Sequence, residues 1–237
     1  MEIKSYILQA CADFNTSLND TQLAQLEAYY KLLVSWNEKI NLTAITEPKE
    51  VAVKHFADSL SGLDCVDIPK NSRIIDVGTG AGFPGIVLKI ARPDLRLTLL
   101  DSLNKRLVFL QTVLDELGLD AELIHSRAED GGQSIDLRET YDFAVSRAVA
   151  RLNVLCEYCL PYVRLGGSFI AYKGKDADLE LDGAKRAVQA LGGKLLNVQK
   201  FLLPLDGGER AVIQIEKVQP TPEKYPRNSA KIKSAPL

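Results

Sequence analysis

Three glycines at alternate positions, Gly78, Gly80 and Gly82, follow a short apolar run and are the residues best placed to do chemistry. Glycine lets the backbone turn tightly and pass close to a ligand. Pro84 follows where a helix would begin, and a helix start offers free N–H groups and a positive dipole end to a polar ligand. Ligands of parallel sheets bind beyond the carboxyl ends of the strands, so this turn predicts a nucleotide or nucleoside-cofactor enzyme.

Two acidic residues bear on which cofactor the turn binds. Asp76 lies two residues before the first glycine, and Asp101 ends the next apolar run, where an acid would bind a ribose diol. The stretch from Gly80 to Gly85 matches the dinucleotide pattern GxGxxG, which leaves NAD open. The Asp-x-Gly-x-Gly-x-Gly spacing that starts at Asp76 resembles the first motif of the S-adenosylmethionine-dependent methyltransferases, in which the acid lies near the methionyl end of the cofactor. This spacing favours S-adenosylmethionine over NAD.

The elements that must position these residues alternate between strand and helix. Apolar runs predict strands at 73–77, 95–100, 121–125, 141–146 and 167–172, with helices at 84–91, 103–117, 151–160 and 177–191. This alternation predicts an α/β fold with a doubly wound, Rossmann-like sheet. Two last runs, 195–203 and 210–218, flank a Pro-Leu-Asp-Gly-Gly turn and predict a hairpin. An antiparallel last strand is typical of the class I methyltransferase fold and is a second argument against NAD.

The first part of the chain shows helical spacing and predicts an N-terminal helical cap on the sheet. Its apolar residues recur three or four positions apart, with Asn19 or Asp20 as the N-cap: Leu23, Leu26, Tyr30, Leu33 and Val34. We divide the chain into the helical cap 1–68, a methyltransferase core 69–218 and a basic C-terminal tail 219–237.

Composition limits the classes of protein to which the chain can belong. The 237 residues, 46% of them hydrophobic and 25% charged, suffice for one sizeable core. A net charge of −2 argues against a general polyanion binder. No apolar run reaches the ~18 residues of a membrane span, and the first residues lack the pattern of a secretory signal. We therefore expect a cytoplasmic protein without membrane association.

Cysteine and histidine spacing predicts no metal site. Cys156 and Cys159 form a CxxC pair, but the pair lies in an apolar segment with helical spacing. His55 and His125 are far apart and lack the spacing of zinc ligands. We expect the two cysteines to lie on a buried helix face.

Several short motifs recur in order along nearly the whole chain: residues 33–44, 55–60, 75–85, 101–106, 126–129, 146–148, 172–174 and 225–227. Together they resemble the glucose-inhibited division protein B family, bacterial guanine-N7 methyltransferases of small-subunit (16S) ribosomal RNA. One departure follows Tyr225-Pro-Arg227, where the family usually has a glycine and this chain continues Asn-Ser-Ala-Lys-Ile-Lys.

The resemblance implies residue roles. S-adenosylmethionine would be held at Gly78, Phe83, Ala128, Glu129 and Arg147, beside Gly80 and Gly82 of the turn, with Asp101 serving the ribose. Arg147 would also be catalytic, since it ends the fourth strand, next to where the methyl group must meet its acceptor. Guanine N7 carries a lone pair and no proton, so direct in-line transfer requires no general base, nucleophile or metal.

Basic residues are the candidates for RNA contacts: Arg127, Arg147, Lys173, Arg210 and Arg227. Surface ion pairs are the alternative interpretation of such residues. His55 and Asp58, one helical turn apart, are expected to share a local hydrogen bond. We expect 16S rRNA or the small ribosomal subunit as partner, and a monomer. The alternatives are a methyltransferase of small metabolites, a non-catalytic ribosome-assembly factor and, more remotely, an NAD-linked oxidoreductase.

Overall fold

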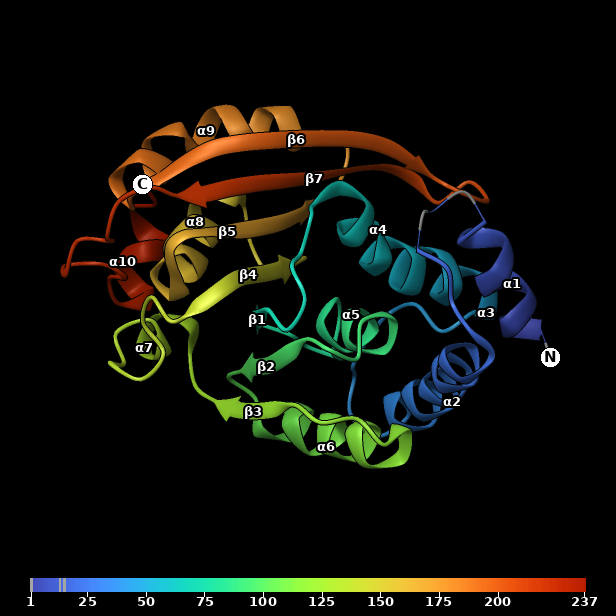
Figure 1. The fold of residues 1–237 in the computed structure, drawn as a ribbon. Helices are drawn as coiled ribbons and strands as arrows, with labels where there is room; N and C mark the ends of the chain where they lie inside the picture. Colours follow the sequence, from blue (N-terminus) through green and yellow to red (C-terminus); the bar gives the residue numbers. More distant parts are fainter. Residues whose placement is uncertain (1, 13, 15) are drawn as a thin grey trace.

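The computed structural model describes residues 2–12, 14 and 16–237. The predicted helical cap includes residues 1, 13 and 15, which lie outside the described residues. Within them, one seven-stranded sheet in the order β3-β2-β1-β4-β5-β7-β6 runs through the molecule (Figure 1). Its strands are β1 (Arg73–Val77), β2 (Arg96–Asp101), β3 (Glu122–His125), β4 (Tyr141–Arg147), β5 (Val163–Lys173), β6 (Gly193–Leu203) and β7 (Gly208–Lys217).

The sheet confirms the predicted α/β topology. Strands β1 to β5 pair in parallel, whereas β7 pairs antiparallel with both β5 and β6. The bounds of β1 are those predicted, and β5 begins at Val163 instead of residue 167. Because β1 and β4 are neighbours, the loops after them open on the same edge of the sheet, which is where ligands bind in such folds.

Helices cover both faces of the sheet. The helices are α1 (Glu2–Ala10), α2 (Asp20–Asn37), α3 (Pro48–Val51), the π-helical turn η1 (Ala52–Ala57), α4 (Asp58–Cys65), α5 (Gly85–Ala91), α6 (Asn104–Leu117), α7 (Ala128–Gly131), α8 (Leu152–Cys159), the 3₁₀ turn η2 (Leu160–Tyr162), α9 (Ala177–Ala190) and α10 (Ser229–Ser234). One apolar cluster joins one face of the sheet to α5, α6 and the N-terminal helices. A second cluster joins the other face to α8, α9 and α10 (Figure 1).

The N-terminal cap is fixed to the core by α2. Asn19 is the N-cap, as predicted, and forms a capping box in which Asn19 and Gln22 each accept the other's backbone N–H at 2.9 Å. The Gln22 amide also donates to the carbonyls of Ile90 and Ala91 at the end of α5. Leu26 and Leu33 are fully buried on the same helix, so the predicted apolar stripe packs onto the core.

The start of α5 differs from the prediction by one residue. Pro84 is the N-cap, and the helix begins at Gly85 instead of at the proline. The backbone N–H of Gly85 donates to Asp76 Oδ2 at 2.8 Å, so a carboxylate from β1 satisfies the first helical N–H.

The last residues of the chain, 219–237, fold back onto α7 and α8. Arg138 donates to the carbonyls of Thr221 and Tyr225 at 2.7 and 2.8 Å, and the Tyr225 ring is buried. Asn228 is the N-cap of α10, and its side chain accepts the backbone N–H of Lys231. Ile232 of α10 is fully buried. The basic tail is thus packed on the core, and the unusual Asn-Ser-Ala-Lys-Ile-Lys stretch forms the helix.

Candidate active site

The glycine turn forms the floor of a cavity at the carboxyl ends of β1, β2 and β4. Gly78 and Gly80 have φ values of +75° and +62°, a region that L side chains rarely adopt. The N–H groups of Gly78 and Thr79 donate to the Leu100 carbonyl at 2.9 and 3.1 Å. A Cβ atom on Gly78 would lie 2.8 Å from Val149 Cγ2, whereas one on Gly80 would come no closer than 3.9 Å to its nearest neighbour, the Gly78 carbonyl oxygen. The turn therefore keeps the backbone itself in contact with the cavity.

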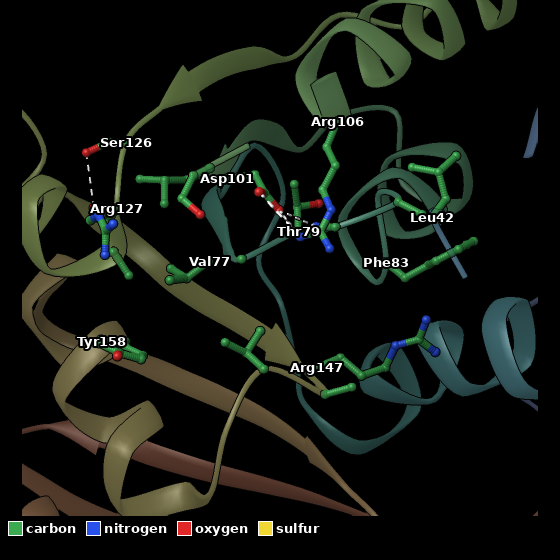
Figure 2. Close-up of a pocket in the computed structure, with 18 of the residues that line it drawn as sticks. Leu42, Val77, Thr79, Phe83, Asp101, Arg106, Ser126, Arg127, Arg147 and Tyr158 are labelled. Carbon is green, nitrogen blue, oxygen red and sulfur yellow. Dashed lines mark hydrogen bonds and ion pairs between the residues drawn. The ribbon is translucent and has the colours of Figure 1, made fainter. Parts of the chain in front are cut away.

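Asp101 holds this turn in place from the end of β2. One carboxylate oxygen accepts the Gly80 N–H and the other accepts the Leu103 N–H, both at 2.9 Å. Arg106 Nη1 lies 3.2 Å from Asp101 Oδ2, and Figure 2 shows Asp101, Thr79 and Arg106 close together at the turn. The Asp101 side chain is almost fully buried but lines the cavity. It is thus positioned both to fix the turn and to meet a ligand.

Asp76 lies beneath the turn and not in the cavity wall. Its Oδ2 accepts hydrogen bonds from the Thr79 hydroxyl and the Gly85 N–H, both at 2.8 Å. Among the described residues its Oδ1 has no hydrogen-bond partner. Burial raises the pKa of Asp76 to about 6. The acid of the Asp-x-Gly spacing therefore shapes the turn and the start of α5. Its place near the methionyl end of the cofactor stays a prediction.

The first cavity has a volume of about 530 Å³ and brings together most of the predicted site residues. Its walls contain Gly78, Gly80, Phe83, Asp101, Arg127, Ala128, Glu129 and Arg147. Among the predicted cofactor residues, Gly82 is the exception: a Cβ there would lie 2.5 Å from the Tyr29 hydroxyl. Because α2 packs so closely at this point, Gly82 allows the cap to approach the turn and does not line the cavity.

The N-terminal cap and the C-terminal segment also contribute residues to the first cavity. The sequence did not predict these contributions. The Asn37 side chain accepts the N–H groups of Leu42 and Thr43 at 2.7 and 2.9 Å and holds their loop against the cavity. Ser229 and Lys233 of α10 line the opposite part. The motif at residues 33–44 was the sequence signal for this loop.

Arg147 ends β4 and is held by residues of the cap. Its Nη1 donates to the Lys54 carbonyl and to Asp58 Oδ2, both at 2.8 Å, and its guanidinium lies 5.1 Å from the centre of the Phe83 ring. The side chain is only 10% exposed. Lys54 belongs to η1, and π-helical turns are frequent at functional sites. The guanidinium is thus fixed before any ligand arrives.

His55 lies beside Arg147 as a neutral ring. It stacks on Phe83 with ring centres 4.5 Å apart, and its Nε2 lies 2.9 Å from the Thr43 hydroxyl. Burial, helped by the Arg147 charge, lowers the pKa of His55 to about 3. The expected hydrogen bond to Asp58 is not formed, because Asp58 instead accepts Arg147 and lies 3.3 Å from Arg210 Nε. Two guanidinium groups are stronger partners for the carboxylate than a neutral imidazole.

A second cavity, of about 520 Å³, adjoins the first. The two share four residues: His55, Arg147, Ala148 and Val149. Of these two cavities, Lys173, Glu180 and Arg210 line the second and not the first. Of the predicted RNA contacts, Lys173 and Arg210 therefore lie in the second cavity. Arg147 lies at the junction and Arg127 at the first cavity (Figure 2).

Arg227, also predicted to contact RNA, is engaged within the protein. Its Nη2 lies 2.6 Å from Glu157 Oε2, and its Nε donates to Glu157 Oε1 at 2.8 Å. Glu157 is fully buried, and hydrogen bonds to it raise the pKa of Arg227. This pair anchors the C-terminal segment that carries α10.

The two cysteines of the CxxC pair lie on α8 and are both buried free thiols, as expected. Burial raises the pKa of the Cys156 thiol to about 12, which makes it unreactive. No helix in the described part of the chain combines the length and apolarity needed to cross a bilayer.

Comparison with known proteins gives consistent matches. A family model described as GidB, rRNA small subunit methyltransferase G, matches residues 22–211. Ribosomal RNA small subunit methyltransferase G of Desulforamulus reducens is 52% identical over 222 residues, covering 93% of this chain and 92% of that protein. The protein of the same name from Alkaliphilus metalliredigens is 48% identical over 238 residues and is covered completely, as is this chain.

A solved structure shares the fold at much lower identity. The 16S rRNA (adenine(1408)-N(1))-methyltransferase from Catenulisporales acidiphilia is 15% identical, with a TM-score of 0.50 over 65% of this chain and 88% of that one. Together with the strand order and the antiparallel β7, this likeness identifies the class I methyltransferase fold.

Proposed function

The chain belongs to the GidB family, rRNA small subunit methyltransferase G, and on this premise we propose that it methylates N7 of a guanosine in small-subunit (16S) ribosomal RNA. The family establishes an S-adenosylmethionine-dependent methyltransferase. The position of the acceptor atom and the roles of individual residues are our proposal.

The first cavity has the size and lining that S-adenosylmethionine requires. Gly78 and Gly80 leave room for the ligand to approach the backbone, and the Asp101 carboxylate lies at the end of β2, where a ribose diol is bound in related sheets. Ala128 and Glu129 follow β3 and would contact the adenine. When bound there, S-adenosylmethionine supplies an electrophilic methyl group on a positively charged sulfur.

The protein's own part in the reaction is to position the reactants. Phe83, His55 and Arg147 are fixed to one another by stacking and hydrogen bonds at the boundary of the two cavities. Holding two reactants in line can supply effective molarities of ~10⁵ M or more. Guanine N7 has no proton to lose, so a neutral, hydrogen-bonded His55 is no obstacle: the transfer needs no general base.

The observation that carries this proposal is the junction of the two cavities at Arg147. The first cavity fits the cofactor, and the second, of about 520 Å³, has room for a base turned out of an RNA strand. A base that enters the second cavity would meet the methyl group beside Arg147.

For RNA binding we propose that Arg127, Lys173 and Arg210 contact the substrate. The Arg127 side chain is 63% exposed beside the first cavity. Lys173 and Arg210 line the second cavity. Arg227 is held by Glu157, and we assign it to the anchoring of the C-terminal segment instead. Because the salt dependence of RNA binding grows with the number of phosphate contacts, these few contacts imply an affinity that falls only gradually with rising salt.

The proposed function also concerns where the enzyme acts, on which substrate, and with which parts of the chain. We propose a cytoplasmic enzyme that acts as a monomer on 16S rRNA or on the assembled small subunit. Within it, residues 1–68 serve as a cap, residues 69–218 as the catalytic core and residues 219–237 as a segment that completes the cofactor cavity.

The test is to incubate the purified protein with methyl-labelled S-adenosylmethionine and unmodified small-subunit RNA or subunits, and to identify the labelled nucleoside. We expect 7-methylguanosine with at least one of these substrates, and none with Gly78→Ala. Label in a different nucleoside would refute the N7 assignment. No label in either substrate, despite cofactor binding, would favour the small-metabolite alternative.

A further inference from the structure

We propose that Glu180 recognises the target guanine by accepting a hydrogen bond from its 2-amino group in the second cavity. This inference rests on the proposed function, because it concerns the base that the enzyme methylates. It assigns a specificity-determining residue that the sequence motifs did not indicate.

The topology places Glu180 on the side of the second cavity away from the cofactor. The first cavity lies over β1, β2 and β4, and the second over β4, β5 and β7. Arg147 of β4 belongs to both cavities, whereas Glu180 of α9 and Lys173 of β5 belong only to the second. A base whose N7 faces the junction at Arg147 therefore turns its opposite edge toward Lys173 and Glu180.

Guanine carries its 2-amino group on the edge opposite N7. Adenine lacks that group, and its N7 is otherwise a similar lone-pair acceptor for a methyl group. A hydrogen-bond acceptor at the far wall therefore selects guanine for N7 methylation, since carboxylates accept readily from amino groups on base edges.

Two carboxylates line the second cavity, and only Glu180 has an oxygen available. Both oxygens of Asp58 face arginine side chains, Arg147 at 2.8 Å and Arg210 at 3.3 Å. Glu180 Oε2 accepts the Leu152 N–H at 2.7 Å and Lys173 Nζ at 2.6 Å. Glu180 Oε1 makes no hydrogen bond to any residue that the structure describes.

The contacts of Oε2 also preorganise the free oxygen. The Leu152 N–H is at the start of α8, and Lys173 Nζ is itself fixed by the Ala150 carbonyl at 2.7 Å. The Glu180 side chain is 24% exposed, so Oε1 is accessible to a base. A carboxylate held in this way loses little conformational freedom when it accepts a hydrogen bond.

The variant Glu180→Gln tests this role without removing the supporting contacts. The amide oxygen can keep the hydrogen bonds from Leu152 and Lys173, while the amide NH₂ replaces Oε1. An acceptor then becomes a donor that faces another donor, the guanine amine. The matched control is Asp178→Asn, a 72% exposed carboxylate on the same helix.

The measurement is the inhibition of subunit methylation by guanosine 5′-monophosphate and inosine 5′-monophosphate at saturating S-adenosylmethionine. The two nucleotides differ only in the 2-amino group. We expect the wild-type protein and Asp178→Asn to bind the guanosine nucleotide about tenfold more tightly. In Glu180→Gln that ratio falls to about one, with an unchanged dissociation constant for the cofactor. The melting temperature should fall somewhat, because buried Lys173 loses its charged partner.

If Glu180→Gln keeps the wild-type preference for the guanosine nucleotide over the inosine nucleotide, the inference is wrong. It is also wrong if neither nucleotide inhibits the wild-type protein. A loss of cofactor affinity in Glu180→Gln would assign Glu180 a purely structural role and overturn it as well. These outcomes are distinct from failure of the proposed function, in which the wild-type protein forms no 7-methylguanosine at all.

Discussion

Asp58 Oδ2 in the helical cap lies 2.8 Å from Arg147 Nη1 at the end of β4, and both side chains are at most 10% exposed. The two residues are 89 positions apart in the chain. Their ion pair joins the cap to the core at the junction of the two cavities. The orientation of Arg147 therefore depends on the N-terminal helices, which makes them part of the active site that we propose.

Replacing Asp58 with Asn should reduce activity more than cofactor binding. The amide keeps one hydrogen bond to Arg147 but removes the compensating charge, so we expect stability to fall by about 1–3 kcal/mol and the rate of methylation at least tenfold. Glu50→Gln is the control, because Glu50 forms a more exposed pair with Lys54. Chemical denaturation and single-turnover methylation measure the two effects; equal rates for the two variants would contradict the assigned role.

The glycine turn yields a prediction with a closely matched control. Gly78→Ala places a Cβ 2.8 Å from Val149 Cγ2 at a φ of +75°, so we expect at least a tenfold weaker affinity for S-adenosylmethionine and a loss of about 1–2 kcal/mol in stability. Gly118, the C-cap of α6, has a φ of +62° and open space around it. Gly118→Ala should lose similar stability but keep the affinity. Titration calorimetry decides, and equal affinities would exclude Gly78 from the cofactor site.

The C-terminal segment should influence cofactor binding through its anchor. Arg227→Ala removes the pair with buried Glu157, which should release α10 and with it Ser229 and Lys233 from the first cavity. We expect the dissociation constant of the cofactor to rise about tenfold, as loss of a buried charge partner is costly.

Lys231→Ala is the control for this prediction, since Lys231 lies on α10 but is exposed and does not line the cavity. If Arg227→Ala weakens RNA binding and leaves cofactor affinity unchanged, the original prediction of an RNA contact is correct and the anchoring role is not.

The raised pKa of Asp76 should make the stability of the protein depend on pH. Burial raises its pKa from 3.8 to about 6, so the folded protein keeps the proton at a pH where the unfolded chain has lost it. This contribution to stability is complete below about pH 4 and is lost as the pH rises through about 6. Asp76→Asn removes the dependence. The variant's stability relative to wild type should improve by on the order of 1 kcal/mol between about pH 5 and about pH 8.

Urea denaturation at the two pH values measures this difference. The exposed Asp136 provides the control, because Asp136→Asn should shift the free energy of unfolding equally at both. A pH-independent difference between Asp76→Asn and wild type would show that the Asp76 carboxyl ionises normally in the folded protein.

Local patterns were enough to predict the sheet and the turn. Apolar runs and glycines report on neighbouring residues, so β1 and the antiparallel β7 could be identified from the sequence, as could the N-cap Asn19. The pairing of Asp58 with Arg147 could not, because it depends on how the cap packs on the sheet. Local spacing suggested His55 as the partner of Asp58 instead.

The position of the C-terminal segment could not be predicted from local patterns either. Its charges suggested a solvated tail or a phosphate contact, but its position depends on Ile232 and on the Arg227–Glu157 pair, which spans 70 residues. Glu180 is likewise one of several acids along α9 in the sequence. Only the packing of α9 against β5 and the start of α8 distinguishes it from the others.

In the proposed function, a guanine in the second cavity is methylated at N7 beside Arg147. The most direct measurement is a map of 7-methylguanosine along the small-subunit RNA of cells that lack the gene and carry either the wild-type protein or Gly78→Ala. We expect one position to carry 7-methylguanosine in cells with the wild-type protein and to lack it in cells with Gly78→Ala. Identical maps in the presence and absence of the wild-type protein would contradict it.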